Sequence, residues 1–198
     1  MKRTMISQIG GGVLIVGFVA GFALVWPMWK SKPLEALNSE LTLRDGHLYR
    51  GAEREPFTGV MLERHENGRW KSRSMVVKGL LHGVSQGWHT NGQLQVREHF
   101  KHGISHGLRT KWLENGKILS ETAIVEGQHH GTFRRWHENG QLAEQIEMKK
   151  GDPDGLSLAY YPSGFVKVQA RLQDGHVVER QSWNDGELKQ PLPANGTN

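Results

Sequence analysis

The sequence of 198 residues contains no cysteine. This absence excludes disulfide bonds, a thiol nucleophile, thiolate metal ligands and a lipid-modified N-terminal cysteine, and it fits either redox compartment. Hydrophobic residues are also few, at 36%, and 25 glycines accompany them. A large helical globule is therefore not expected, although the length is sufficient for one domain or two small ones.

Acidic residues are absent from the first 32 positions, where four of the 25 Lys and Arg residues lie. The formal net charge of +5 and the pI near 9.6 would, taken alone, indicate a nucleic-acid-binding protein. Without those four cations, residues 33–198 carry 21 positive and 20 negative charges. Because the body of the chain is nearly neutral, we expect no nucleic-acid partner.

An uncharged run of 21 residues extends from Ile9 to Trp29. At about 1.5 Å per helical residue it is long enough to cross a hydrocarbon core of about 30 Å. We predict a basic segment at 1–8, a transmembrane helix or signal anchor at 9–29 and a linker at 30–40. Two alternatives stay open, a cleaved secretory signal that releases the protein, and a buried domain helix.

The membrane orientation follows from the charges beside this run. Lys2, Arg3 and the terminal amine precede it, whereas Lys30 and Lys32 follow it, so the N-terminal side has a slight positive excess. The positive-inside rule then favours a single-pass protein whose body lies on the extracytoplasmic side, in the periplasm of a bacterium.

Glycine recurs with a period of 24 residues between positions 59 and 175. Three independent glycine columns share this period, and so does a column of aromatic residues, which identifies a tandem structural repeat. A sixth, shortened copy with slipped spacing follows at Trp183–Gly186, as is typical of a terminal repeat. The glycine columns are Gly59, Gly83, Gly107, Gly131 and Gly155; Gly68, Gly92, Gly116, Gly140 and Gly164; and Gly79, Gly103, Gly127, Gly151 and Gly175.

Each copy reads as a β-hairpin. In residues 83–106, two stretches of alternating apolar residues flank Asn91-Gly92, a pair that favours a type I′ turn with positive φ at both central residues. We therefore predict an all-β fold, an elongated single-layer antiparallel β-meander of 24-residue hairpin repeats with a hydrophobic stripe on one side and no separate globular centre. On this pattern the apolar face carries Val84, Trp88, Leu94, Val96 and Phe100.

These repeats resemble a known family. The segments WLENGKILSE and WHENGQLAEQ, the glycine-bounded HG steps and the lead-in RDGHLYRGAEREPFTGVM at Arg44–Met61 are similar to the MORN-repeat variant of antitoxin proteins of the YwqK type. The resemblance covers about 41–186, which we assign to the repeat domain, and leaves 187–198 as a disordered tail. It implies a MORN-like fold, an antitoxin role and binding of protein or lipid, whereas the N-terminal span departs from a soluble antitoxin.

The eleven histidines are the main candidates for metal binding or catalysis. Equivalent residues in successive hairpins should lie about 10 Å apart, too far to share one ion within a column. We therefore expect solvated turn residues and no metal site, with pH sensing as a further alternative. The two histidine columns are His82, His106 and His130, and His65, His89 and His137, the second interrupted by Leu113.

Catalytic motifs are not found in the sequence. It has neither a G-x-S-x-G elbow nor a phosphate-binding G-x-x-x-x-G-K loop, and the glycines are explained by the repeat. We predict no catalytic residue, no cofactor and no enzyme activity. Recurrent carboxylates such as Glu114 and Glu138 are expected to be surface charges beside turns.

The aromatic column is the candidate partner-binding site. Its alternation with apolar columns favours packing, but an exposed aromatic ladder would supply anchors for a partner. Our functional hypothesis is a membrane-anchored β-repeat module that binds another protein, in its specific form a toxin neutralised by occlusion. The alternative is a cell-envelope scaffold or lipid-surface protein, and the oligomeric state stays open. The candidate partner-binding residues are Trp88, Trp112, Trp136 and Tyr160.

Overall fold

The computed structural model describes residues 33–192, all of them within the compact unit Pro33–Asn198. The basic segment predicted at 1–8, the membrane span predicted at 9–29 and the last six residues of the predicted tail lie outside the described residues. Within 33–192, no helix has the length and apolar character needed to cross a membrane.

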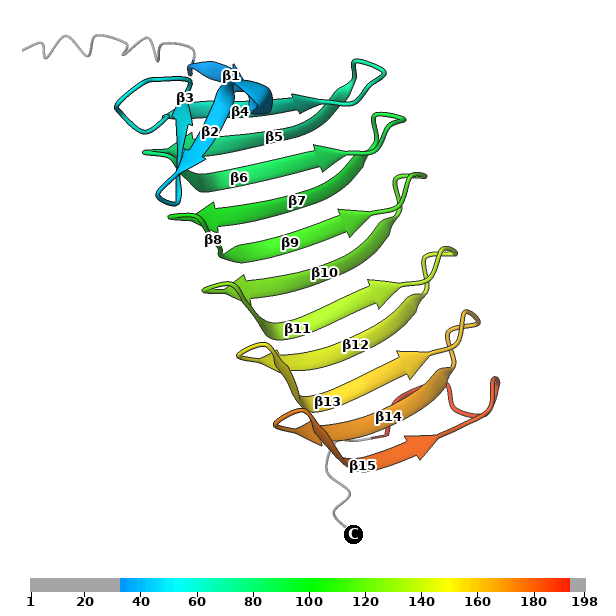
Figure 1. Ribbon diagram of the computed structural model, residues 1–198. Coiled ribbons are helices and arrows are strands. Elements are labelled where there is room, and N and C mark those ends of the chain that lie inside the picture. The colour runs from blue at the N-terminus through cyan, green and yellow to red at the C-terminus, as the bar shows by residue number, and fades with distance from the viewer. Residues whose placement is uncertain (1–32, 193–198) are drawn as a thin grey trace, which may run out of the picture. The chain divides into compact units, whose positions relative to one another are not determined.

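The described chain folds into one long, mainly antiparallel sheet, in which successive strands lie side by side in sequence order (Figure 1). This confirms the predicted all-β meander of hairpin repeats. The exceptions are β1, which pairs in parallel with β4, and the separate hairpin β2–β3. The elements are β1 Glu35–Leu37, a 3₁₀ turn Asn38–Glu40, β2 Leu41–Arg44, β3 His47–Arg50, β4 Gly59–Arg64, β5 Trp70–Val77, β6 Leu80–Trp88, β7 Leu94–Lys101, β8 Ile104–Ser105, β9 Gly107–Trp112, β10 Ile118–Val125, β11 Gln128–Trp136, β12 Leu142–Lys149, β13 Asp152–Tyr160, β14 Val166–Gln173 and β15 His176–Ser182.

Two kinds of turn alternate along the sheet, and the type I′ turn is not where the sequence predicted it. At Asn91-Gly92 only the glycine has positive φ, 91°. The amide of Gly92 donates to the carbonyl of His89, and the amide of His89 donates to the carbonyl of Gln93. This is a three-residue hairpin loop with glycine in the left-handed region, not a two-residue turn.

The two-residue turns lie at the opposite ends of the strands. Glu126 and Gly127 connect β10 to β11 and both have positive φ, 50° and 81°, as a type I′ turn requires. The same pair of positive φ values recurs at Lys78-Gly79, His102-Gly103, Lys150-Gly151 and Asp174-Gly175. Each repeat therefore contains one turn of each kind.

The predicted single hydrophobic stripe is wrong, because a β-bulge divides it between the two faces. Trp88 pairs with Leu94, but the adjacent Gly87 pairs with Val96, so Gln95 is the extra residue. Since neighbours on a strand point to opposite faces and cross-strand partners to the same face, Leu94 and Val96 lie on opposite sides. The equivalent register shift recurs between β4 and β5, β11 and β12, and β13 and β14.

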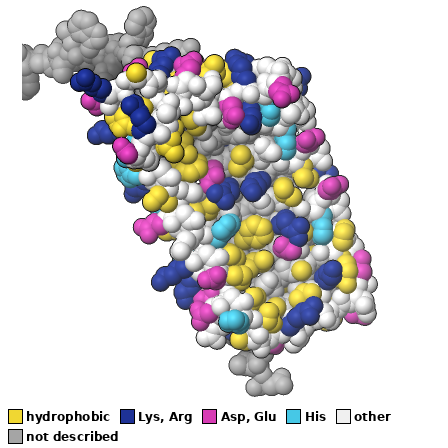
Figure 2. Space-filling view, in the orientation of Figure 1, with side chains coloured by type: hydrophobic (Ala, Val, Ile, Leu, Met, Phe, Trp, Pro, Cys, Tyr) yellow, Lys and Arg dark blue, Asp and Glu magenta, His cyan; other side chains and the backbone are white. Residues whose placement is uncertain are grey.

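We call the two sides the front face and the back face. The front face carries the hairpin β2–β3 and is the side seen in Figures 1 and 2, where hydrophobic side chains gather along its middle. Met61 and Val76 belong to it, and in the next hairpins Val96 and Phe100. The back face carries Val84, Trp88 and Leu94 and their equivalents.

A small local core, which the sequence did not predict, forms where β2–β3 covers the front face. Ala36, Phe57 and Val76 are almost completely buried in it. The amide of Leu48 donates to the carbonyl of Gly79, and this bond fixes the hairpin β2–β3 to the turn at Lys78-Gly79. Most of the predicted linker 30–40 is therefore structured, since it contains β1 and the 3₁₀ turn. The partly buried residues around this core are Leu41, Leu48, Met61 and Leu81.

The C-terminal segment 187–192 also differs from the predicted disordered tail. The amide of Val166 donates to the carbonyl of Leu188 at 2.8 Å. The side-chain amide of Gln169 clamps the backbone of Leu192, accepting from its nitrogen at 2.9 Å and donating to its oxygen at 3.2 Å. Because Gln169 and Val166 belong to the back face, this segment lies on that face over β14.

Candidate partner-binding surface

The four predicted partner-binding residues lie in one row on the back face, one in each successive hairpin. All four are partly buried, and no pair of their rings is in contact. Burial raises the pKa of the Tyr160 hydroxyl above its ordinary value. The structure therefore aligns Trp88, Trp112, Trp136 and Tyr160 but does not form them into a stacked ladder.

The neighbouring strands fill the gaps in this row with apolar side chains. Leu94 lies opposite Trp88, Ile118 opposite Trp112 and Val166 opposite Tyr160. At the start of the row, the guanidinium of Arg64 lies 3.6 Å from the centre of the Trp70 ring, a cation–π contact. A shallow hollow of about 330 Å³ is lined there by Arg64, Arg69, Trp70, Trp88 and Gly92.

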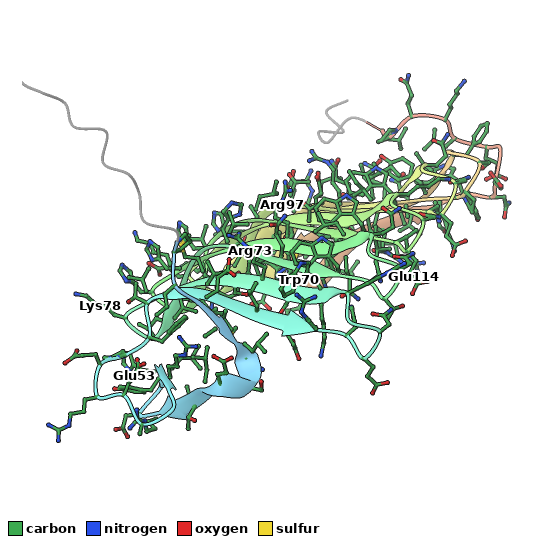
Figure 3. All side chains as sticks on the ribbon, turned by 90° about the horizontal axis from the view of Figure 1, so that it is seen from above. Glu53, Trp70, Arg73, Lys78, Arg97 and Glu114 are labelled. Atoms are coloured by element: carbon green, nitrogen blue, oxygen red, sulfur yellow. The ribbon has the colours of Figure 1, made fainter. Side chains whose placement is uncertain are left out.

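A row of mostly polar residues runs beside the aromatic row. Arg73 pairs with Gln86, and Gln86 pairs with Arg97 on the next strand, so the three side chains lie in line across β5, β6 and β7. Figure 3 shows Arg73 and Arg97 on the side of the sheet opposite to β2–β3. Both are exposed, and neither has a hydrogen-bond or ion-pair partner within the described residues.

Exposed aliphatic side chains form the other border of this polar row. Met75, Val84 and Leu108 are 42%, 41% and 50% exposed, although each comes from the middle of the sheet. The back face of β5–β9 thus presents arginines between an aromatic row and an aliphatic row, whereas Val60 and Leu62 on β4 are buried. Uncovered apolar surface of this kind is typical of a site that binds another molecule.

Two arginines on the front face form ion pairs within the chain, in contrast to Arg73 and Arg97. The guanidinium of Arg109 pairs with the carboxylate of Glu98, which also accepts from the Ser105 hydroxyl. The guanidinium of Arg135 donates two hydrogen bonds to the carboxylate of Glu144, and this bonding raises the pKa of Arg135. Arg109 and Arg135 are therefore already neutralised by partners within the chain.

One histidine column has a structural function that the sequence analysis missed. The Nε2 atoms of His65, His89 and His137 donate to the carbonyl oxygens of the aromatic residues one repeat further on, at 2.8, 3.0 and 2.9 Å. These histidines are partly buried, so the expectation of solvated turn residues is wrong for them. Their recurrence beside the aromatic column was the signal that could have revealed the bond. The accepting residues are Trp88, Trp112 and Tyr160.

Asparagines in the three-residue loops form a parallel ladder. The side-chain oxygen of Asn91 accepts from the amide of Gln93, and its side-chain nitrogen donates to the carbonyl of Glu114 in the next repeat at 2.8 Å. Asn67 and Asn139 make the same two kinds of contact. These ladders hold adjacent hairpins in register and so keep the aromatic row straight.

No group of three or more His, Asp or Glu side chains within residues 33–192 is placed to hold a metal ion. In the other histidine column, the ring of His82 lies edge-on to that of His102, with 5.4 Å between the ring centres. His106 accepts from the amide of Glu126 at 3.4 Å. These contacts bring two histidines together and provide no third ligand.

These features define a β-repeat protein built from one open sheet. The family model for the MORN repeat variant matches residues 81–102 and 130–150, which correspond to the hairpins β6–β7 and β11–β12. The match confirms the MORN-repeat part of the resemblance. A comparison with curated proteins finds no match.

Among solved structures, a mutant of S. aureus TarM in complex with Fondaparinux, alpha-GlcNAc-glycerol and UDP is similar to part of the chain. The match has 13% sequence identity and a TM-score of 0.33, and it covers 48% of this chain. It spans 19% of the other protein, about a fifth of its length. A likeness at this level carries no argument about function.

Proposed function

We propose that this chain is a protein-binding module that its N-terminal apolar segment attaches to a membrane, with the repeat domain on the extracytoplasmic side. The observation that carries the proposal is the back face of β5–β9, where Met75, Val84 and Leu108 stay exposed beside Arg73 and Arg97, which have no partner within residues 33–192. A continuous hydrogen-bonded sheet that still exposes apolar side chains is a pre-formed surface for a partner.

The specific role we propose is that of an antitoxin or immunity-type protein, which would neutralise its partner by occlusion. The basis is the resemblance to MORN-variant antitoxins together with the rigid, laddered sheet. A rigid surface loses little conformational entropy on binding, so it can cover a partner's active surface without rearrangement. Partly buried Trp88 and Trp112 would then serve as anchors at the edge of the contact.

Genetics tests the antitoxin role. We expect deletion of this gene to prevent growth unless an adjacent gene is deleted too, and expression of that neighbour alone to be toxic. A harmless single deletion, with no toxic neighbour, would remove the antitoxin role. Envelope defects in that harmless deletion would favour the alternative of an envelope scaffold.

Cysteine labelling tests the location, because the natural chain has no cysteine to interfere. Val178 on β15 is exposed, so a Val178→Cys variant provides one accessible thiol. We expect a membrane-impermeant maleimide to label it in spheroplasts without lysis. Labelling only after lysis would place the repeat domain in the cytoplasm, and labelled protein in the medium would indicate a cleaved signal.

A further inference from the structure

We propose that the back face of β5–β9 binds an extended acidic segment of a partner protein, whose carboxylates contact Arg73 and Arg97. The inference rests on the proposed protein-binding function and names the chemistry of the partner. It starts from the charges, because the back-face positions of these strands include three cations and no acidic residue. These cations are Arg73, Arg97 and Lys101.

The spacing of the two arginines selects an extended partner. Arg73 and Arg97 are in register across a single intervening strand, β6. With about 4.8 Å between strands, their backbones lie about 10 Å apart. In a polyproline II segment, which has three residues per turn and rises about 3.1 Å per residue, side chains three residues apart lie on the same side and are separated by about 9 Å. A segment in this extended conformation that crosses these strands with an acidic residue at every third position would meet both guanidinium groups.

The surroundings of the arginines fit the other residues of such a segment. Trp70 and Trp88 border them on one side, and Met75 and Val84 on the other. Uncharged side chains between the carboxylates would contact these apolar groups. Guanidinium groups on such a surface also form stronger ion pairs than fully solvated ones, since apolar neighbours exclude water from the contact.

The chain itself already shows a polypeptide segment held at this column of the back face. Gln169 is the repeat equivalent of both Arg73 and Arg97, by whole multiples of 24 residues. Its side chain holds the backbone of Leu192 through two hydrogen bonds. Val166, beneath the same segment, is 0% exposed, whereas its equivalent Ile118 is 39% exposed. The segment 188–192 thus occupies at β14 the kind of site that is open at β5–β7.

Peptide binding by the full chain in detergent micelles tests the proposal. The probe is a short fluorescent proline-rich peptide with glutamate at every third position, so that its carboxylates lie on one side, and its counterpart carries glutamine instead. Anisotropy should show binding of the glutamate peptide, weakened about five- to tenfold by the double substitution Arg73→Gln and Arg97→Gln. The glutamine peptide should bind the wild type equally weakly, and added salt should reduce the difference.

A matched control removes the same charge from the front face. Lys111→Gln with Arg180→Gln changes two exposed residues there and should leave peptide binding unchanged. Arg73 and Arg97 have no internal partner, so their variant should keep the wild-type circular dichroism spectrum. Equal peptide affinity in the wild type and both double variants would overturn the proposal.

Two other occupants give different results, and either would overturn the acidic-peptide assignment. If the substitutions at Arg73 and Arg97 abolish binding to phosphatidylserine vesicles but not to the peptide, the surface binds lipid. If light scattering shows a wild-type dimer that these substitutions dissociate, the occupant is a second copy. If the peptide does not bind but the neighbouring gene proves toxic, the acidic-segment proposal is refuted and the antitoxin role is not. If the peptide binds but no neighbouring gene is toxic, the antitoxin role is refuted and the acidic-segment proposal is not.

Discussion

The imidazole of His89 donates a hydrogen bond to the carbonyl oxygen of Trp112, which lies 23 residues further along the chain, with 3.0 Å between Nε2 and the oxygen. The His89 side chain is only 13% exposed. Because a carbonyl can only accept, Nε2 carries the hydrogen in this bond. The bond joins one repeat to the next at the backbone of the aromatic row and so couples repeat stability to the shape of the candidate surface.

Replacing His89 by leucine should destabilise the fold by about 1–2 kcal/mol, because the partly buried carbonyl of Trp112 loses its donor. Leucine fits the position sterically, since Leu113 occupies the same column one repeat later. The measurement is guanidinium unfolding of the full chain, followed by tryptophan fluorescence. His130→Leu is the control, since His130 is exposed and its side chain forms no hydrogen bond within residues 33–192. If His89→Leu lowers the free energy of unfolding no more than this control does, the histidine hydrogen bonds do not stabilise the sheet.

Asn91→Ala should cost more stability than Asn115→Ala. Both asparagines accept from the amide two residues later, but only Asn91 also donates to the next repeat, at the carbonyl of Glu114. At Asn115 the corresponding contact is made by Lys117, whose Nζ donates to the carbonyl of Glu138. The expected difference is about 0.5–1 kcal/mol, the net value of one hydrogen bond, measured by the same unfolding assay. Equal losses would contradict a contribution from the cross-repeat bond.

Glu126→Asn should stabilise the chain. Glu126 is the first central residue of a type I′ turn and has a φ of 50°, a conformation that costs most L-residues energy and suits asparagine. We expect a gain of a few tenths of a kcal/mol up to about 1 kcal/mol, seen as a higher unfolding midpoint. Gly127→Ala is the opposing variant. Gly127 has a φ of 81°, a conformation that is strained for a residue with a Cβ, so this substitution should lower the unfolding midpoint. A midpoint lowered by Glu126→Asn would contradict the assigned turn.

These turns show what the sequence could and could not predict. The period of 24 residues predicted the meander, because glycine columns and alternating apolar residues report backbone conformation directly. The same pattern placed the type I′ turn at Asn91-Gly92, since a three-residue loop also needs a left-handed glycine after a polar residue. The bulge at Gln95 left no local signal, and so the division of apolar residues between two faces was not predicted.

The candidate site was predicted only in part. The aromatic column was recognised, but its flanking arginines were not. Arg73 and Arg97 are 24 residues apart and so share one repeat column, but the face on which they lie depends on the strand register and its bulges. The bonds of the histidine ladder connect residues 23 positions apart and escaped a local reading. The ordered segment 187–192 is held by contacts with Val166 and Gln169 rather than by any pattern of its own.

Acid should open the turn at Asn184–Glu187, which precedes the C-terminal segment in the chain. The Glu187 carboxylate accepts hydrogen bonds from the side chain and from the backbone amide of Asn184. These two bonds, the side-chain bond having the larger effect, lower the pKa of Glu187 below its ordinary value. Because the pKa of Glu187 is lower in the folded chain, these bonds contribute their full stabilisation at pH values above the unfolded-state pKa of about 4.3. This stabilisation is lost as the pH falls through the folded-state pKa. The measurement is the pH dependence of the Asn184 amide signals by NMR. Glu187→Gln should abolish this titration, and an unchanged titration in that variant would assign it to another group.

Photocrosslinking in living cells tests the central claim, that the back face is the surface used by a protein partner. A photoreactive amino acid would replace Met75 or Leu108 on the back face, and Lys111 on the front face as the control. We predict one crosslinked partner from both back-face positions, through a segment with recurrent acidic residues, and none from Lys111. Adducts of equal yield from both faces, or an adduct from Lys111 alone, would contradict the account.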